Sequence, residues 1–309
     1  YSINVESEEE AFFINQVASE LNLVAPIAFR VNPNVDAKTH KYISTGKSEN
    51  KFGIDFEFIL DAYERASSLP HLKLKGLQMH IGSQLTSVSP FVEAVEKVTP
   101  LAADLKNKYD IEFFSIGGGI GIVYEEALAS GSESWWTKQP DETRPLTPEQ
   151  YSSAIIPSLA PLGLKILLEP GRFIAGNAGV LVTKCLYEKK GSTKTFKIVD
   201  SGMHHLIRPA LYEGFHEIVP VAEPKGAVES VDVVGPICES GDFFCQNREV
   251  PTFAPGEFIA LMSAGAYGMV MATTYNSHPL PAEILVDRNQ ARIARKRQTF
   301  QDLVEGEEG

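Results

Sequence analysis

The first 176 residues alternate apolar, strand-like runs with segments of helical periodicity, and this alternation constrains the fold more strongly than any other feature of the sequence. The strand-like runs are residues 1–5, 25–33, 72–84, 111–121 and 164–176. The helix-like segments are residues 7–21, 55–69, 90–110 and 147–162. Strands that are joined by helical crossovers pair in parallel, so the pattern predicts an α/β fold built on a parallel sheet.

A second pattern begins after Ala178, where short alternating strands with turn residues between them replace the helices. The expected strands are residues 179–191, 195–202, 215–221, 231–242, 257–268 and 291–298. Only residues 299–306 are expected to form a brief helix. We therefore expect two domains: residues 1–178 form five strand-helix units of a β/α barrel, and residues 179–309 form an all-β domain that is a sandwich or barrel-like.

The composition fits a globular enzyme and excludes several other classes of protein. The 309 residues are 43% hydrophobic and 22% charged, which is enough for a large core and two domains. The net charge is -12 and basic residues cluster only at 292–297, which argues against nucleic-acid binding because that needs a basic face. No run approaches the roughly 20 apolar residues of a membrane span. Three cysteines without Cys-x-x-Cys spacing favour a reducing cytoplasm.

The last three strand-like runs end in polar residues and glycines, at the end of a parallel strand where functional groups are displayed. The third run ends in His80, Gly82 and Ser83, the fourth in Gly117, Gly118 and Gly119, and the fifth in Glu169 and Arg172. Because the carboxyl ends of successive strands converge in a β/α barrel, we expect these residues to share one site. A buried ion pair between Glu169 and Arg172 is the purely structural alternative.

The glycine-rich segment at residues 117–121, Gly-Gly-Gly-Ile-Gly, matches neither common nucleotide-binding motif. A dinucleotide fingerprint that started at Gly117 would need glycine in place of Ile122, and a Walker loop would need Gly-Lys-Ser or Gly-Lys-Thr. Consecutive glycines after a strand still allow backbone N–H groups to surround an anion such as phosphate. A tight turn without a ligand explains the segment equally well, so both interpretations stay open.

Six motifs occur in an order that is similar to that of one enzyme family. They are HIGSQ at 80–84, GGGIG at 117–121, EPGR at 169–172, RPALY at 208–212, GPICESGD at 235–242 and SAGAYG at 263–268. Together they resemble the pyridoxal-phosphate decarboxylases of the alanine-racemase-like fold (fold type III), and among them the meso-diaminopimelate decarboxylase family. Residues 30–46 and 51–53 are similar to the same family.

The resemblance implies both a fold and an activity. The fold would be a barrel that binds pyridoxal 5'-phosphate, followed by the β domain. The activity would be decarboxylation of meso-2,6-diaminopimelate to L-lysine and carbon dioxide, the last step of lysine biosynthesis. Two other functions stay open: decarboxylation of arginine, ornithine or carboxynorspermidine, and cofactor binding without catalysis.

The resemblance also implies which residues bind the cofactor. Glu169 would lie against the pyridine nitrogen and keep it protonated, since a nearby carboxylate favours the cationic form of a base. The protonated ring would then accept the electrons left when carbon dioxide departs. His80 would stack on the ring, unless it is only a hydrogen-bonded histidine at a strand end. The phosphate would be held by Ser83, Gly117, Gly118, Gly119, the amides of Gly171 and Arg172, and the hydroxyl of Tyr267.

A further set would bind the amino-acid substrate. Arg172 and Arg208, with Tyr212, resemble the family's clamp for the distal carboxylate, because a guanidinium pairs with a carboxylate through two hydrogen bonds. Glu239 would face the distal ammonium group, and Tyr267 would contact both substrate and cofactor. The alternative for Arg208 is a solvated surface residue.

Cysteines and histidines complete the candidates. The resemblance makes Cys238 the acid that returns a proton to the α-carbon, whereas a small apolar role is the alternative. Cys185 and Cys245 are interpreted as apolar residues. The pair His204 and His205 suggests a metal, but no carboxylate or cysteine spacing supports one, and no metal is expected.

The resemblance implies a homodimer with shared active sites, in which Cys238 and Glu239 act in the barrel of the partner. Two-fold dimers are also the commonest oligomers. An eight-unit barrel needs roughly 250 residues, so three units and the lysine that carries the cofactor are expected to precede Tyr1. The remaining lysines are poor substitutes: Lys38, Lys41, Lys47 and Lys51 occur in a polar loop, and Lys165 begins a strand. The polar insertion at 127–150 has no functional interpretation.

Overall fold

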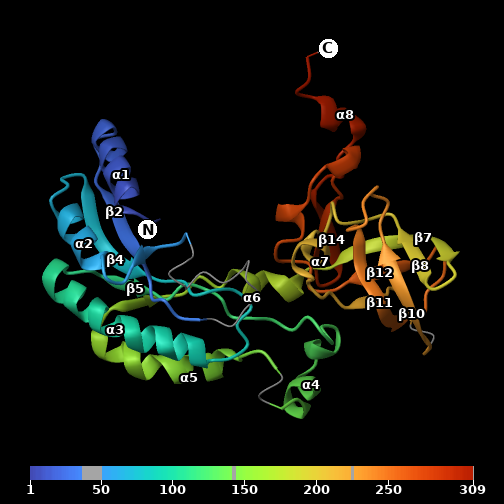
Figure 1. Ribbon diagram of the computed structural model, residues 1–309, viewed down its shortest axis with the longest axis horizontal. Helices are drawn as coiled ribbons and strands as arrows, with labels where there is room; N and C mark the ends of the chain where they lie inside the picture. The colour runs from blue at the N-terminus through green and yellow to red at the C-terminus, as the bar shows by residue number, and fades with distance from the viewer. Residues whose placement is uncertain (37–50, 141–143, 224–225, 309) are drawn as a thin grey trace. The chain divides into compact units, whose positions relative to one another are not determined.

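The chain divides into two compact units, which are described separately. A computed structural model describes residues 1–36, 51–140, 144–223 and 226–308 (Figure 1). The α/β unit comprises Tyr1–Ile122 and Lys138–Ile174, and the β unit comprises Val123–Thr137 and Ala175–Gly309. Lys38, Lys41 and Lys47 lie outside the described residues. The domain boundary expected after residue 178 stays a prediction.

The sheet of the α/β unit is wholly parallel, and the predicted fold class is confirmed there (Figure 1). Its main strands, in hydrogen-bonded order, are β1 (Ile3–Val5), β2 (Ala25–Asn32), β4 (Leu72–Gln78), β5 (Phe113–Ser115) and β6 (Lys165–Leu167). A two-residue strand, β3 (Ile54–Asp55), pairs with β2. Each pair is parallel, so the strands end at one common edge.

The register aligns the strand ends of this sheet in one row. Arg30 of β2 is level with Gln78 of β4, and Gln78 is level with Ser115 of β5. Ser115 is level in turn with Leu167 of β6. Glu169 follows Leu167 by two residues and therefore emerges at the same edge as the other three side chains.

Four helices connect the strands of the α/β unit. They are α1 (Glu8–Glu20), α2 (Ile59–Ser67), α3 (Ser89–Tyr109) and α5 (Pro148–Leu159). Hydroxyl groups cap two of them, because Ser7 accepts the N–H of Glu10 and Thr147 accepts the N–H of Gln150. Helices α3 and α5 lie side by side (Figure 1). No helix within the described ranges is long and apolar enough to cross a membrane.

The β unit is built on a six-stranded sheet that is nearly closed. The hydrogen-bonded order is β11 (Phe243–Pro251), β10 (Val228–Val234), β8 (Thr195–Val199), β7 (Leu181–Lys190), β12 (Phe258–Leu261) and β9 (Ile218–Pro220). The outer strands β11 and β9 contact each other, which gives the sheet a barrel-like curvature. The predicted all-β fold class of this part is confirmed. Cys185 and Cys245 lie in its apolar core.

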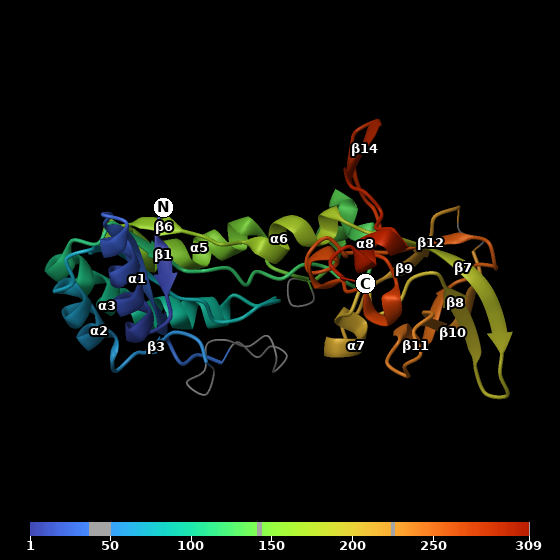
Figure 2. The ribbon, with the colours of Figure 1, turned by 90° about the horizontal axis from the view of Figure 1, so that it is seen from above.

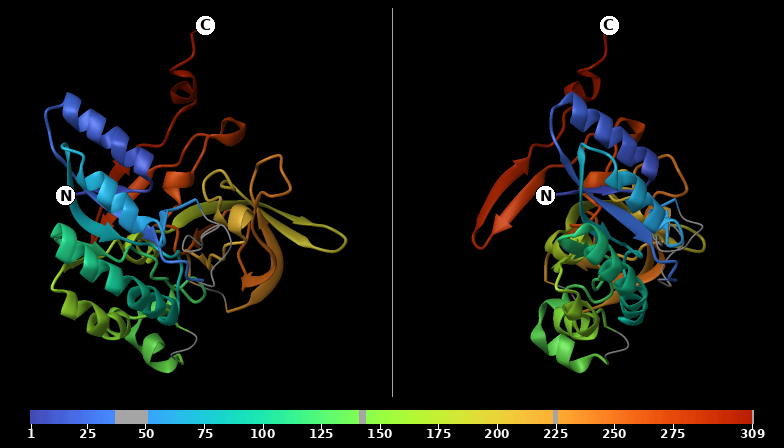
Figure 3. Two further views of the ribbon diagram at one scale, coloured as in Figure 1. Left: turned by 60° about the vertical axis from the view of Figure 1, so that its left-hand side comes forward. Right: turned by 90° about the vertical axis from the view of Figure 1, so that its left-hand side faces the viewer.

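A separate hairpin and a short helix follow the six-stranded sheet. Strands β13 (Glu283–Asp287) and β14 (Gln290–Arg295) pair antiparallel, and the hairpin projects away from the sheet of the same unit (Figures 2 and 3). Helix α8 (Phe300–Val304) comes next, inside the predicted segment 299–306. Single 3-10 turns occur at Ala129–Gly131, Ala160–Leu162, Gly176–Ala178, Met269–Met271 and Tyr275–Ser277.

Sequence periodicity missed several elements of the β unit. Strand β11 has the polar centre Gln246–Arg248, which interrupts apolar alternation, and β13 was not expected either. Helix α7 (Arg208–Tyr212) has five residues and starts with Pro209 in its first turn, so it is too short to show helical periodicity. The expectation of a single helix at the end of this part is therefore wrong.

The insertion that had no interpretation from sequence contains a short helix, α4 (Glu133–Lys138), which carries both tryptophans. The indole N–H of Trp135 donates to the Glu126 carboxylate at 2.7 Å, and that of Trp136 donates to the Ser130 carbonyl at 2.8 Å. The two rings meet edge to face with centroids 5.1 Å apart. The tryptophans therefore fold this segment onto itself.

Gly76 allows a close approach of β4 to β5, and this contact gives a test of the packing. A Cβ at Gly76 would lie 2.4 Å from the Phe113 ring. We expect Gly76→Ala to lower the free energy of unfolding by about 1–3 kcal/mol, the usual cost of overpacking a core. Far-UV circular dichroism during denaturation, dominated by the helices of the α/β unit, measures the change.

The double variant Gly76→Ala/Phe113→Leu is the control, because a smaller side chain at 113 relieves the clash. The double variant should be more stable than the sum of the two single changes predicts. Strict additivity would contradict the proposed contact.

Candidate functional site

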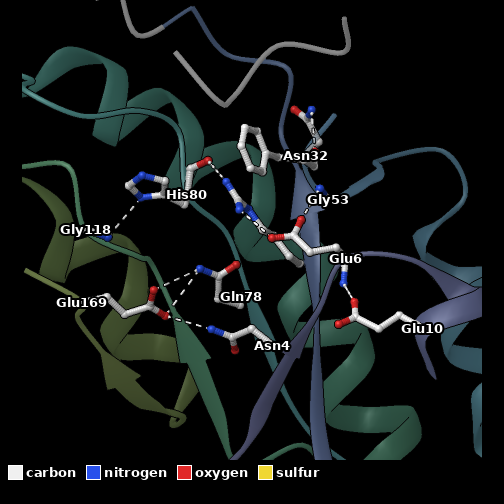
Figure 4. Close-up of polar contacts among 11 residues, drawn as sticks. Asn4, Glu6, Glu10, Asn32, Gly53, Gln78, His80, Gly118 and Glu169 are labelled. Atoms are coloured by element: carbon white, nitrogen blue, oxygen red, sulfur yellow. Dashed lines mark hydrogen bonds and ion pairs between the residues drawn. The ribbon is translucent and has the colours of Figure 1, made fainter. Parts of the chain in front are cut away.

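Glu169 lies just beyond β6, where its exposed carboxylate is held by neutral donors from β1, β4 and β5, of which Figure 4 shows Asn4 and Gln78. The Ser115 hydroxyl donates to it at 2.7 Å. The side-chain amides of Asn4 and Gln78 each donate at 3.3 Å. Among the described residues no cation pairs with this carboxylate, so the buried ion pair with Arg172 is not formed. The carboxylate is fixed in direction and open to a cationic ligand.

His80 follows β4 and lies on the same edge of the sheet (Figure 4). Its Nδ1 accepts the backbone N–H of Gly118 at 3.2 Å, so the ring is held in one orientation. Burial, followed by the positive charge of Arg30, lowers the pKa of His80 to about 4. At neutral pH the ring is therefore neutral, and its Nδ1 lone pair accepts the Gly118 N–H.

The glycines of the run 117–119 are required by close packing between strand ends. A Cβ at Gly117 would lie 2.4 Å from the Met79 carbonyl oxygen, and one at Gly118 would lie 2.3 Å from that of Glu169. Gly119 has a φ of +106°, which disfavours any residue with a side chain. The tight-turn interpretation is thus supported, and it does not conflict with binding an anion at the same backbone.

Arg172 and Ser83 contact each other directly. Arg172 is only 6% exposed, and its Nε and one terminal nitrogen donate to the Ser83 hydroxyl oxygen at 3.2 and 3.1 Å. Because this oxygen accepts twice, the hydroxyl hydrogen of Ser83 is directed away from the guanidinium. Gly171, the first residue of α6 (Gly171–Ala175), has open space where a side chain would lie.

Sequence reasoning missed an ion pair next to His80, in which Arg30 contacts Glu6 (Figure 4). The Arg30 guanidinium donates to Glu6 at 2.7 Å and to the His80 carbonyl at 3.3 Å, and it lies over the Phe52 ring. Glu6 also accepts the N–H of Gly53 at 2.6 Å. The alternation of β2 did not distinguish Arg30 from a surface cation, so only the register revealed this contact.

In the β unit, Arg208 is 7% exposed, so the interpretation as a solvated surface residue is wrong. Its guanidinium donates to Nε2 of His216 at 2.7 Å and lies 4.5 Å from the centroid of the Tyr124 ring. His216 is fully buried, and its Nδ1 lies 2.7 Å from the Met262 carbonyl oxygen. That carbonyl can only accept, so Nδ1 carries the proton and Nε2 is free to accept from Arg208.

Two tyrosines of the predicted set lie in the β unit as well. Tyr212 is half-buried at the last residue of α7, four residues after Arg208 and so on the same face. Tyr267 is 38% exposed and has a φ of +64°, a conformation that costs a side-chain-bearing residue energy. Backbone strain of this kind clusters at binding sites, which supports Tyr267 as a candidate.

Cys238 and Glu239 lie on an exposed loop between β10 and β11. The Glu239 carboxylate accepts the Tyr275 hydroxyl at 2.7 Å. Hydrogen bonding to this carboxylate raises the pKa of Tyr275. Tyr275 was not among the sequence candidates, because no motif marks it. The structure therefore presents the thiol and carboxylate side by side in the chain, both open to a ligand or another chain.

His204 and His205 form a histidine cluster with His278. Ring centroids lie 3.7 Å apart for His204 and His205 and 4.8 Å apart for His204 and His278. His205 contacts the Ser201 hydroxyl and the Pro279 carbonyl, whereas both ring nitrogens of the buried His204 lack a hydrogen-bond partner in the described structure. Among the described residues, no group of three or more His, Cys, Asp or Glu side chains is placed to hold a metal ion.

Comparison with known proteins gives consistent matches. Residues 1–176 match the family described as "Pyridoxal-dependent decarboxylase, pyridoxal binding domain". The chain is 43% identical over 303 residues to the diaminopimelate decarboxylase of Aquifex aeolicus and 42% identical over 302 residues to that of Vibrio cholerae. These alignments cover 98% and 97% of this chain and 69% and 68% of the two relatives.

A solved structure is also similar to this one. The crystal structure of diaminopimelate decarboxylase from Helicobacter pylori complexed with L-lysine matches with a TM-score of 0.88 and 39% sequence identity. The match covers 98% of this chain and 72% of that chain. The similarity thus extends through both units of this chain.

The buried His204 makes the stability of the β unit depend on pH. Burial, followed by the charges of His205 and His278, lowers the pKa of His204 to about 3, below the ordinary value of 6.5. The unfolded chain therefore binds a proton that the folded chain does not. We expect stability to fall as the pH drops from about 6.5 toward 3, with a contribution from His204 of up to about 1.4 kcal/mol per pH unit.

The change His204→Phe removes the titrating group and should flatten this dependence, whereas His71→Phe, a change in the α/β unit, should leave the pH profile of the β unit as in the parent. Fluorescence of the two tryptophans, which both lie in the β unit, measures its unfolding at each pH. Identical pH profiles for the parent and His204→Phe would refute the assignment.

Proposed function

This chain belongs to the pyridoxal-dependent decarboxylases and, among them, to the diaminopimelate decarboxylase family, and from that premise we propose that it decarboxylates meso-2,6-diaminopimelate to L-lysine and carbon dioxide. The reaction is that of a lyase and belongs to lysine biosynthesis. The cofactor of the family is pyridoxal 5'-phosphate.

The residues of the α/β unit fit this cofactor. It carries a ring nitrogen that can be protonated and a phosphate dianion, and the strand ends offer groups of matching kind. The exposed Glu169 carboxylate is oriented by three neutral donors and lacks a cationic partner among the described residues. The glycine run carries no side chains that would keep an anion away from its backbone.

When bound, pyridoxal phosphate supplies an electron sink for the charge left by departing carbon dioxide. Glu169 would hold the proton on the ring nitrogen, because a carboxylate in contact favours the cation. Ser115, Gln78 and Asn4 hold the carboxylate in one orientation for that contact. His80 would lie on the ring face as a neutral flat side chain whose orientation Gly118 fixes.

The phosphate site would combine backbone and side-chain donors. Ser83 is suited to this site because its hydroxyl oxygen accepts from Arg172, which leaves the hydroxyl hydrogen to donate to the phosphate. The amides of Gly119 and Arg172 and the hydroxyl of Tyr267 complete the proposed set, whereas the amides of Gly117, Gly118 and Gly171 already donate to Ser115, His80 and Glu169. Several donors are needed, since a dianion removed from water must replace many hydrogen bonds.

One observation in the β unit carries the choice of substrate: Arg208 is buried and its guanidinium is fixed by His216. A guanidinium that is held in one orientation can pair with a carboxylate through two hydrogen bonds. We assign Arg208, with Arg172 and Tyr212, to the distal carboxylate of the substrate. Ornithine and lysine have no carboxylate at that end and would not need the arginines.

The loop residues complete the proposed mechanism. Glu239 would pair with the distal ammonium of the substrate, and its carboxylate is already oriented by the Tyr275 hydroxyl. Cys238 would give the proton of its thiol to the α-carbon after carbon dioxide has left. Both side chains are exposed, as such roles require.

The experiment that tests the function is carbon dioxide release by the full-length protein. We expect release with meso-2,6-diaminopimelate and little with ornithine, arginine or carboxynorspermidine. Release from one of those three instead would favour the alternative decarboxylase. Cofactor binding without release from any of them would identify a non-catalytic module.

Assembly and location follow as further parts of the proposal. We assign the protein to a homodimer in which Cys238 and Glu239 act in the partner's barrel, because both are exposed on a loop and two-fold dimers are common. A cytoplasmic location is supported by three free cysteines, two of them buried.

The Arg208–His216 contact gives a prediction for substrate binding. Arg208→Ala should raise the KM for diaminopimelate by about 10- to 150-fold, because a lost hydrogen bond to a charged group costs about 1.5–3 kcal/mol. His216→Leu should raise KM in the same direction, since it leaves the guanidinium unoriented. His216→Gln keeps an acceptor near the position of Nε2 and should raise KM less than His216→Leu does. Steady-state kinetics measure KM in each variant, and the affinity for the cofactor is the control. An unchanged KM in Arg208→Ala would show that Arg208 does not bind the substrate.

Shared sites give a second prediction. Cys238→Ala and Arg172→Ala should each be nearly inactive alone, but mixing them should restore up to about a quarter of the parent activity, because half of the dimers are hybrids and each hybrid holds one intact site. Carbon dioxide release after denaturant-free subunit exchange measures the recovery. No recovery despite exchange shown by mass spectrometry would mean that each subunit uses its own loop.

A further inference from the structure

Asp242 closes the motif Gly-Pro-Ile-Cys-Glu-Ser-Gly-Asp, although the proposed mechanism gives it no part. Asp242 is 4% exposed, and its carboxylate accepts two backbone N–H groups, each at 2.6 Å. One oxygen accepts from Ile237, directly before Cys238, and the other accepts from Met203. Burying a carboxylate is costly, and two charge-assisted hydrogen bonds offset that cost.

The backbone of Asp242 closes the same loop. Its N–H donates to the Glu239 carbonyl at 3.1 Å, and its carbonyl accepts the N–H of Gly235 at 3.2 Å. Within the loop, the N–H of Glu239 donates to the Ile237 carbonyl at 2.8 Å. Residues 235–242 therefore form a compact turn around Asp242, and Cys238 and Glu239 lie on its exposed side.

Two glycines make room for this carboxylate. A Cβ at Gly202 would lie 2.4 Å from a carboxylate oxygen of Asp242, and a Cβ at Gly235 would lie 2.5 Å from one. Neither glycine has a positive φ, so backbone conformation does not explain them. Both are explained by the space that the Asp242 side chain occupies.

The contact with Met203 extends the effect beyond the loop. Met203 lies in the turn after Gly202, where the N–H groups of His205 and Leu206 donate to the Gly202 carbonyl. This turn leads directly into α7, which begins at Arg208. One buried carboxylate thus joins the loop that presents Cys238 to the segment that presents Arg208.

We infer that Asp242 is the positioning residue of the catalytic loop: it fixes the direction of Cys238 and Glu239 relative to Arg208 through the amides of Ile237 and Met203. This inference rests on the proposed function for the roles of the three residues. The fixing of the loop itself does not depend on that function.

The test uses Asp242→Asn in the full-length protein, with Asp232→Asn as a matched control. Asp232 is equally buried in the β unit and also accepts a backbone N–H, from Asn247 at 2.6 Å, but it lies outside the loop. In Asp242→Asn one amide N–H faces the new side-chain NH2 instead of an oxygen. We expect kcat for diaminopimelate to fall at least about 10-fold, as expected from losing a hydrogen bond to a charged acceptor, while cofactor affinity stays unchanged.

Hydrogen exchange provides the readout that does not need activity. The amides of Gly235, of residues 237–242 and of Met203 should exchange faster in Asp242→Asn than in the parent and in Asp232→Asn. Equal exchange in all three proteins, or an equal loss of kcat in both variants, would overturn the inference. If the parent releases no carbon dioxide from diaminopimelate, the proposed function fails, but the exchange comparison still tests the positioning of the loop.

A second variant covers the case in which Asp242→Asn does not fold. Gly235→Ala keeps the Asp242 side chain, but the new Cβ would lie 2.5 Å from a carboxylate oxygen and would force it to shift. It should give the same pattern in weaker form, with faster loop exchange and a lower kcat. Parent-like exchange and kcat in Gly235→Ala would count against the inference.

Discussion

The parallel register of the α/β sheet is the constraint on which the proposed cofactor site depends. It places Arg30, Gln78 and Ser115 level with one another, with Glu169 just beyond the next strand. Gln78 and Glu169, 91 positions apart in the chain, thereby meet within hydrogen-bond distance. A shift of one residue in any pair would turn a polar side chain to the opposite face and leave the carboxylate without its donors.

The glycines at residues 117–119 shape this same edge of the α/β sheet. Because they approach the carbonyl oxygens of Met79 and Glu169 so closely, they bring the ends of β4, β5 and β6 together. His80 takes its orientation from the amide of Gly118. The packing requirement and the proposed binding role therefore apply to the same backbone, and a substitution there would affect both stability and cofactor binding.

In the β unit, buried polar side chains hold exposed or reactive ones in place. His216 accepts from Arg208, and the Asp242 carboxylate accepts from the loop of Cys238. Each supporting group is paired on both sides, so the energetic cost of its burial is offset. Buried partners of this kind fix the orientation of the side chains they contact more precisely than an exposed loop could.

The alternation of strands and helices, the change to an all-β part and the residues at the strand ends could be predicted from the amino-acid sequence, because these depend on local periodicity and on the composition of short motifs. The contacts of His216, Asp242 and Tyr275 became evident only in the folded chain, since no spacing rule links Arg208 to His216 or Ile237 to Asp242. Strand β11 and helix α7 escaped prediction because a polar centre and a length of five residues hide their periodicity. Sequence patterns report which face a residue occupies, whereas hydrogen bonds between distant segments depend on register and packing, which only the folded chain fixes.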